Sequence, residues 1–277
     1  MSKTLGLLVI HGMGDTLPDF HAPLIASLRE RLRGDWQRIA SRPVYYQPIL
    51  QRHQRAIFDR MRPELRWEGL RELMLFGFSD AASLEHKKEL PGSPYYHTQK
   101  LILEQLDELF EELGHVAAPL VGVAQSLGGQ VISNYIWDAQ QPRAYAGIWN
   151  GDLDDGVMPD TPRDRFRRMQ SLQRLLTTGC NIPVFVAGHA SIEPIDRRKL
   201  GADFRWLNQF DPDDAFGWPL AQLSPRYAEL VEDVAVNARG DSLLDTLKSV
   251  SPYSHTQYWE TARVLDRIAA ELRALLA

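Results

Sequence analysis

Several features that would assign a protein to a special class are missing from this 277-residue sequence. Cys180 is the only cysteine, which excludes a disulfide framework and a metal cluster held by thiolates. No run approaches the roughly 18 consecutive apolar residues of a membrane-spanning helix, and the apolar stretch near the N-terminus is too short for a signal peptide. The net charge of −5 gives no reason to expect nucleic acid or an anionic membrane as a partner. These absences favour a cytoplasmic protein without stable membrane insertion.

What remains is the composition of an ordinary globular protein, with 44% hydrophobic and 24% charged residues. The length is that of one elaborated domain, and the sequence has no internal repeat. Histidines and carboxylates do not occur at metal-ligand spacing; Asp152, Asp154 and Asp155 lack the pattern of a calcium-binding loop. We therefore expect one domain over residues 1–277, with neither a cofactor nor a metal.

Short apolar runs bounded by turn residues alternate with apolar residues at helical spacing. The runs predict strands at residues 5–10, 43–47, 120–124, 182–187 and 205–210. The helical spacing predicts helices at residues 20–32, 98–113, 127–141 and 258–276. Strands that alternate with helices imply a mostly parallel sheet covered on both faces, which is an α/β fold.

Two long segments interrupt this alternation, at residues 50–97 and 150–178. The second begins with an acidic, glycine-bearing loop and continues into a basic helix, whose arginines at 163–174 we interpret as a solvated face. Insertions of this length often form lids or pocket walls, and we expect that role here. Surface elaboration without a role in binding is the alternative.

The stretch AQSLGG, residues 124–129, places Ser126 between a predicted strand and a predicted helix. Such a turn exposes the serine Oγ and directs the first N–H groups of the helix at a reacting carbonyl oxygen. Ala124 occupies the first glycine position of the G-x-S-x-G pattern, but a small residue is sufficient there, and Gly128 and Gly129 keep the other side open. We predict that Ser126 is a nucleophile, which needs a base, an orienting acid and donors for an oxyanion.

The stretch LLVIHGMGD places His-Gly-x-Gly directly after the first predicted strand. This loop can turn sharply and leave a backbone N–H free for an oxyanion, with His11 orienting the loop. The alternative is the phosphate-binding loop of a nucleotide-binding α/β protein. That interpretation is weak because HGMGDT lacks the full G-x-G-x-x-G pattern and the P-loop lysine.

In this order, VIHGMGD, AQSLGG and the C-terminal SHTQYW resemble the α/β-hydrolase superfamily, in particular its compact lipase- and esterase-like members. The resemblance extends from residue 4 to the last helix, but the first two strands of a full-length hydrolase are missing. It implies a doubly wound, mainly parallel sheet with helical insertions and a Ser–acid–His triad in that chain order. It also implies that the N–H groups of Met13 and Leu127 form the oxyanion hole.

The resemblance also selects a base from the eight histidines. His255 alone lies after the last predicted strand and before the final helix, where α/β-hydrolases place this residue. His189 follows the predicted strand at 182–187 and is the competitor. A base at His189 would give the chain order Ser–His–Asp, which the family does not use.

The acid is less well determined, because DPDD after the predicted strand at 205–210 offers Asp211, Asp213 and Asp214. The acid must accept the histidine Nδ1–H and so fix its tautomer. In similar hydrolases the acid is followed by one residue and then by an apolar one, which favours Asp214 because Phe216 stands in that place. Asp211 lies nearer the strand end, and Glu193 follows the preceding predicted strand.

The sequence therefore predicts a serine hydrolase that cleaves a small-molecule carboxylic ester through a Ser126–Asp214–His255 triad and an acyl-enzyme intermediate. Thioesterase or amidase activity is one alternative. A catalytically inactive hydrolase-fold binding protein is another, because a fold does not by itself fix a function. The sequence indicates neither the acyl-chain preference nor the oligomeric state.

Overall fold

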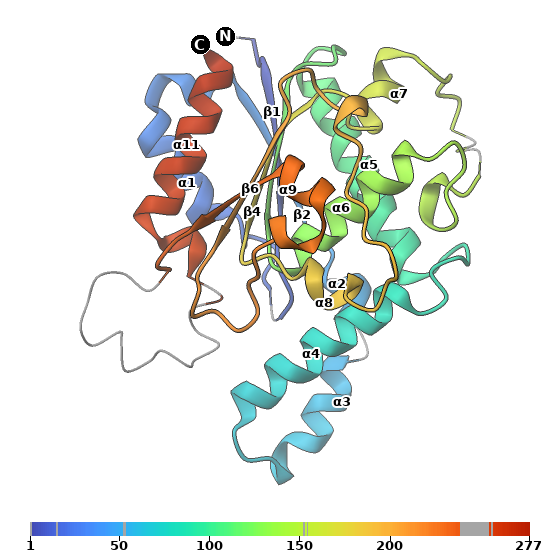
Figure 1. Cartoon of the computed structure of the whole chain (residues 1–277), viewed down its shortest axis with the longest axis vertical. Coiled ribbons are helices and arrows are strands. Elements are labelled where there is room, and N and C mark those ends of the chain that lie inside the picture. The colour runs from blue at the N-terminus through green and yellow to red at the C-terminus, as the bar shows by residue number, and fades with distance from the viewer. Residues whose placement is uncertain are drawn as a thin grey trace.

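A computed structural model of the chain describes residues 2–14, 16–51, 54–151, 153, 155–238, 255 and 257–277. At its centre is a six-stranded sheet (Figure 1). Its strands are β1 (Leu5–Ile10), β2 (Ile39–Val44), β3 (Leu120–Gln125), β4 (Leu172–Thr178), β5 (Arg205–Phe210) and β6 (Val231–Ala235). Every pairing is parallel. This confirms the predicted α/β class.

The strand order is β2-β1-β3-β4-β5-β6. The chain moves from β1 outward to β2 and then returns to the other side of β1 to form β3. The winding direction therefore reverses between β1 and β3. Open α/β sheets bind ligands at the carboxyl ends of the strands that flank such a switch point. These ends carry the HGMG loop after β1 and Ser126 after β3.

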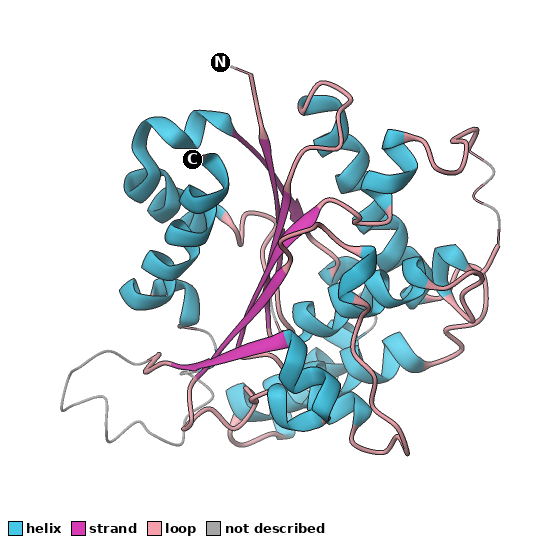
Figure 2. Cartoon of the chain, turned by 45° about the horizontal axis from the view of Figure 1, so that its top comes forward, coloured by secondary structure: helices cyan, strands magenta, loops and turns pink. Residues whose placement is uncertain are grey.

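Helices cover both faces of the sheet (Figure 2). On one face, α1 (Ala22–Leu32) and α11 (Ala262–Leu276) pack against Leu5, Leu7 and Val9 of β1. On the other, α5 (Pro94–Glu112) and α6 (Leu127–Gln140) pack against Leu8 and Ile10. Because β1 is buried on both faces, its apolar run is continuous instead of alternating.

Six further helices among the described residues connect these elements. They are α2 (Gln47–Gln51), α3 (Gln54–Met61), α4 (Glu68–Glu85), α7 (Pro162–Arg167), α8 (Ile182–Val186) and α9 (Pro225–Leu230). Figure 1 shows that α3 and α4 project from the body of the molecule. Phe58 of α3 packs on Phe76 of α4, with ring centroids 5.8 Å apart. Within the described residues, no helix combines the length and the apolar content needed to cross a membrane.

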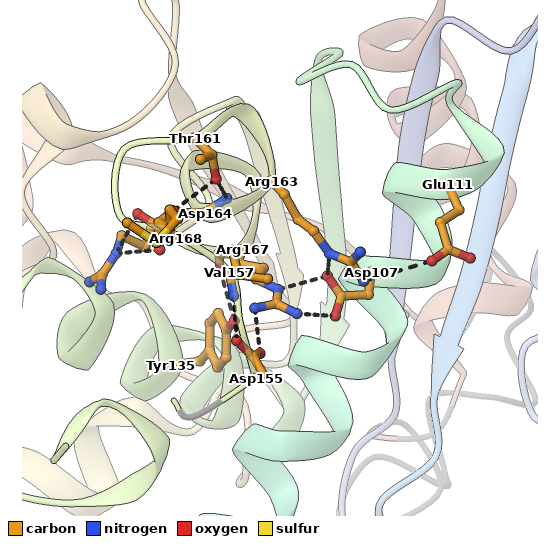
Figure 3. A network of polar contacts seen from close by, with 11 residues as sticks. Asp107, Glu111, Tyr135, Asp155, Val157, Thr161, Arg163, Asp164, Arg167 and Arg168 are labelled. Carbon is orange, nitrogen blue, oxygen red and sulfur yellow. Dashed lines mark hydrogen bonds and ion pairs between the residues drawn. The ribbon is translucent and has the colours of Figure 1, made fainter. Parts of the chain in front are cut away.

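The segment at 150–178 is fixed to α5 by charged side chains (Figure 3). Arg167 donates to both carboxylate oxygens of Asp107, at 2.7 and 2.6 Å, and to Asp155 at 2.6 Å. Arg163 also donates to Asp107, at 2.9 Å. Burial acts to raise the pKa of Asp107, but the two arginines outweigh it and lower that pKa. The Arg167 side chain is only 5% exposed, so the expectation that these arginines form a solvated face is wrong for this residue.

The predicted helix at 163–174 is also wrong beyond its first turns. Helix α7 ends at Arg167, and the chain enters β4 at Leu172. Leu172, Leu175 and Leu176 have helical spacing, which misled the prediction. All three are completely buried because β4 lies inside the sheet with helices on both faces. A strand buried on both faces need not alternate. Asp152 and Asp154 of the acidic loop lie outside the described residues.

Other differences concern short apolar or polar runs. The predicted strand at 182–187 is helix α8, which has Pro183 in its first turn, a favourable helix position for proline. The strand predicted at 43–47 instead spans Ile39–Val44, where Pro43 is tolerated because β2 is an edge strand. The sequence VEDVA of β6 was not predicted, because a partly exposed edge strand needs few apolar residues. The strands predicted at 5–10, 120–124 and 205–210 are confirmed.

Candidate active site

Ser126 occupies the turn between β3 and α6 with φ 50° and ψ −122°. This backbone conformation is rare for a residue with a side chain, and strain of this kind is concentrated at functional sites. The turn is held in place because the Ser126 N–H donates to Thr178 O and the Ser126 carbonyl accepts from the Gly129 N–H, both at 2.9 Å. It presents the serine side chain at the carboxyl edge of the sheet, as in a nucleophile elbow.

Two glycines allow the loop after β1 to approach this turn closely. A Cβ at Gly128 would lie 2.4 Å from His11 O, and one at Gly12 would lie 2.9 Å from Ser126 Cβ. Ala124, by contrast, is a buried residue inside β3, paired with Ile10 of β1. The tight backbone contact therefore falls at position 128, and an alanine at 124 fits the sheet.

The structure brings Ser126, His255 and Asp214 together. His255 Nε2 lies 2.6 Å from Ser126 Oγ, and His255 Nδ1 lies 2.7 Å from Asp214 Oδ2. With the proton on Nδ1, the imidazole donates to the carboxylate and accepts from the serine hydroxyl. Gln125 supports this orientation by donating to the His255 carbonyl at 2.8 Å. All three side chains are buried.

Asp214 receives two further hydrogen bonds. Its Oδ2 accepts from Tyr258 Oη and its Oδ1 from the Phe216 N–H, both at 2.9 Å. Burial acts to raise the pKa of Asp214, but the bonds from His255, Phe216 and Tyr258 outweigh it and leave that pKa below its ordinary value. The carboxylate is thus charged at neutral pH. Neither Tyr258 nor Gln125 had a sequence signal, because the contribution of each depends on contacts distant along the chain.

The other candidate acids do not contact His255. Asp211 accepts from the backbone N–H groups of Asp213, at 2.9 Å, and Ala238, at 3.0 Å, and so holds the turn after β5. Asp213 is exposed. Glu193 forms an exposed ion pair with Arg226, with 2.7 Å between Glu193 Oε2 and Arg226 Nη1. Among the four candidates, the carboxylate that reaches the imidazole is that of Asp214.

His11 uses both ring nitrogens to fix the HGMG loop. Its Nδ1–H donates to Gly12 O at 2.6 Å, and its Nε2 accepts from the Tyr46 N–H at 3.1 Å. The imidazole also stacks on the Tyr46 ring, with centroids 4.0 Å apart. Burial lowers the pKa of His11 to about 4, so the ring is neutral at pH 7. With both nitrogens occupied, His11 orients the loop.

The backbone N–H groups of Met13 and Leu127 make no hydrogen bond to any of the described residues. Leu127 is the first residue of α6, where an N–H has no partner within the helix. Met13 lines the same cavity as Ser126. Both groups are available donors close to the serine turn, and the positive end of the α6 dipole adds to the field there.

A cavity of about 350 Å³ opens over Ser126 and His255; we call it the Ser126 cavity. Its walls are the HGMG loop, Phe20 and Trp259 on one side and Gly69, Glu72 and Phe76 of α4 on the other. The first long segment, 50–97, therefore borders this cavity. None of the described residues of 150–178 lines it.

The remaining candidates lie apart from these groups. Cys180 is buried against Gly129, and burial raises the pKa of its thiol to about 12, so it stays protonated. His189 lines a different cavity. Within the part of the chain that the structure describes, no cluster of three histidine, cysteine or carboxylate side chains is arranged to hold a metal ion.

The sequence matches no family model and no curated protein. Among solved structures, it is similar to a candidate hydrolase of the alpha/beta superfamily from Xanthomonas campestris pv. campestris, with 12% identity, a TM-score of 0.39, and coverage of 97% of this chain and 98% of that one. It is also similar to the metagenomic carboxyl esterase MGS0156, with 11% identity, a TM-score of 0.34, and coverage of 99% and 77%. Both TM-scores are below 0.5, so the fold is established by the chain's own doubly wound sheet and strand–serine–helix turn.

Proposed function

We propose that this chain is a serine hydrolase that cleaves a small-molecule carboxylic ester. The observation that supports this most directly is the unbroken hydrogen-bonded path from Ser126 Oγ through His255 to Asp214, at a cavity wall. A buried serine, an imidazole and a charged carboxylate in that order are what a nucleophile, its base and the orienting acid require.

In the acylation step, Ser126 Oγ attacks the ester carbonyl carbon while His255 Nε2 accepts the hydroxyl proton. Asp214 holds the Nδ1–H and stabilises the imidazolium that forms. The carbonyl oxygen becomes an oxyanion, which would accept from the Met13 and Leu127 N–H groups, because neither of these groups binds a described residue. Collapse of this intermediate breaks the ester C–O bond, and His255 returns the proton to the leaving alcohol.

In the deacylation step, water takes the place of the alcohol. His255 removes a proton from the water, whose oxygen attacks the acyl carbon, and then returns a proton to Ser126 Oγ as the carboxylic acid leaves. A thioester or an amide can follow the same sequence. We favour an ester over an amide because an alcohol leaves more readily than an amine and needs no group other than His255 to assist it.

A fluorophosphonate probe tests this proposal, because it reacts covalently with activated serine hydroxyls. We expect stoichiometric labelling, located at Ser126 by peptide mass spectrometry, and none in Ser126→Ala. Ser133→Ala is the matched control, since Ser133 is a buried serine of the same helix that does not line the Ser126 cavity. A folded protein that resists the probe and hydrolyses neither p-nitrophenyl acetate nor p-nitrophenyl butyrate would instead indicate an inactive binding protein.

A further inference from the structure

A second cavity, of about 400 Å³, lies along the outer side of α6. Five residues of α6 line it, all on one helical face because they are spaced three or four apart: Gln130, Ser133, Asn134, Trp137 and Asp138. We call it the α6 cavity. At 1.5 Å per residue it extends along about 12 Å of the helix axis and begins one turn beyond Ser126. It shares no lining residue with the Ser126 cavity.

Several buried polar groups face the α6 cavity with hydrogen-bonding capacity to spare. Gln130 is 5% exposed; its Nε2 donates to Asn134 at 2.9 Å, while its Oε1 has no partner among the described residues. The hydroxyls of Ser133 and Tyr227, both in buried residues, also make no hydrogen bond within the described part of the chain. Two hydroxyls that line one cavity with hydrogen-bonding capacity to spare indicate a site for a ligand.

Asp138 supplies the charge of this site. Its Oδ2 accepts from Tyr95 Oη at 2.6 Å and from Gln99 Nε2 at 2.7 Å. Both bonds come from donors and so favour the ionised carboxylate, against the burial that raises the pKa of Asp138 above its ordinary value. No described residue binds Oδ1, and Asp138 lines the cavity, so one oxygen remains available for a donor.

The other charged groups at the α6 cavity largely cancel one another. Lys88 pairs with Glu85 at 2.5 Å, and Glu193 pairs with Arg226 at 2.7 Å. These two ion pairs are neutral overall, so Asp138 leaves the cavity with a net negative charge. An anionic ligand is therefore disfavoured, and a cationic one is complementary.

Apolar and aromatic side chains form the rest of the wall. Ile182, Phe185 and Val186 of α8 face the α6 residues, and Trp137 is 39% exposed at the rim. A mostly apolar cavity with a few convergent polar groups is the usual form of a small-molecule site. Aromatic rings beside a carboxylate also suit an organic cation, because the ring face attracts positive charge.

From these contacts we propose that the α6 cavity binds a small organic amine. Its ammonium group donates to Asp138 Oδ1, and its apolar body packs between Trp137 and Phe185. This site is separate from the one proposed for the ester, and it does not depend on Ser126 being a nucleophile.

The test uses three probes of nearly equal size: 2-phenylethylamine, 2-phenylethanol and phenylacetate. Titrations of the full chain at pH 7, followed by protein-observed NMR, should show saturable binding of the amine. We expect the alcohol to bind about tenfold more weakly, since it lacks the charge-assisted hydrogen bond, and phenylacetate to bind most weakly. Equal affinity for the three probes, or no saturation by the amine, overturns the proposal.

Variants locate the binding. Asp138→Asn keeps an oxygen that accepts from Tyr95 and Gln99, and it should bring the amine to within about twofold of the alcohol. Asp203→Asn is the control, because it makes the same change at an exposed residue outside the α6 cavity. It should leave the tenfold preference for the amine over the alcohol unchanged.

Labelled protein separates this proposal from the proposed function. Because the two cavities share no lining residue, chain carrying fluorophosphonate on Ser126, or the Ser126→Ala variant, should bind the amine with unchanged affinity. Amine binding that disappears on labelling would show that the α6 cavity is part of the ester site and would contradict a separate site. Failure of labelling itself bears on the hydrolase proposal alone.

Discussion

The Ser126 cavity and the α6 cavity adjoin the same helix, but the polar side chains of the two cavities differ in how they are hydrogen-bonded. At Ser126 the hydroxyl, imidazole and carboxylate bind one another in sequence. Along α6, Gln130 and Asp138 each keep an oxygen that no described residue binds. Groups that pass a proton must contact one another beforehand, whereas groups that recognise a ligand must keep capacity for it. The two pairing patterns therefore fit the two roles that we propose, catalysis at Ser126 and ligand binding along α6.

The largest effect is expected from a substitution of Asp214, the last residue of the proposed proton path. Asp214→Asn should lower kcat for p-nitrophenyl acetate by about 10⁴-fold, because the amide no longer fixes the His255 tautomer or stabilises the imidazolium. Asp211→Asn is the matched control. The Asp211 carboxylate accepts hydrogen bonds from two backbone N–H groups. Its replacement by an amide should therefore reduce thermal stability, while kcat changes by less than about tenfold. Steady-state kinetics of both variants decide this, and a reversed ranking would contradict Asp214 as the acid.

A smaller effect on kcat should follow from pushing the loop after β1 away from the turn at Ser126. In Gly128→Ala the new Cβ would lie 2.4 Å from His11 O, so the backbone must shift at the proposed oxyanion donor Leu127. Misplacing one such donor lowers kcat by about 10²-fold. Gly34→Ala, at a position with no atom within 4 Å of the new Cβ, should behave as wild type. Equal kinetics for both variants would show that this approach is not needed.

Asp80 extends this comparison to a third buried carboxylate. It lies on α4, the helix that also contributes Gly69, Glu72 and Phe76 to the wall of the Ser126 cavity. Like Asp138, it is held by neutral donors: Gln51 and Gln54 donate to its two oxygens at 2.9 and 3.0 Å. Burial raises the pKa of Asp80 from 3.8 to about 6, against these hydrogen bonds. Its protonated form is therefore favoured by folding. The stability that protonation contributes is fully present below pH 4 and is lost as the pH rises through about 6.

Asp80→Asn removes this pH dependence. At pH 8 the variant should be more stable than wild type by at most about 3 kcal/mol, the free energy that corresponds to the change in pKa. At pH 4 the difference should shrink towards zero or reverse. Urea denaturation at pH 4, 6 and 8 measures it, with Asp203→Asn as an exposed control. A difference that does not vary with pH would count against this interpretation.

The smallest effect concerns the alanine in AQSLGG. Ala124→Gly restores the glycine of the G-x-S-x-G pattern, but position 124 lies inside β3 and not at the close approach. We expect kcat to stay within about twofold of wild type and the free energy of unfolding to fall by about 1 kcal/mol, because glycine loses more backbone entropy in a strand. A tenfold gain in kcat would show that the alanine restricts the turn.

Elements with one strong local pattern could be predicted from the sequence, and elements defined by their neighbours could not. The helix predicted at 98–113 has an apolar stripe and coincides with α5 up to Glu112, and β1 is an uninterrupted apolar run of six residues. In contrast, residues 172–174 were predicted as helix but belong to strand β4, and residues 182–187 were predicted as a strand but contain helix α8. A short apolar run satisfies a buried strand and a buried helix equally well, and the packing of the whole sheet decides between them.

By itself, the sequence determined the order of the functional segments and the identity of Ser126 and His255 as candidates, because turns rich in glycine are local and chain order is linear. It also narrowed the acid to DPDD and Glu193. Only the tertiary structure decided that Asp214 is the carboxylate within 2.7 Å of the imidazole, and that Asp211 holds the turn. Hydrogen bonding depends on distance and direction, and those are set where β5, β6 and the C-terminal segment meet. The α6 cavity had no sequence signal for the same reason, since its unpaired polar atoms become apparent only when every neighbour is in place.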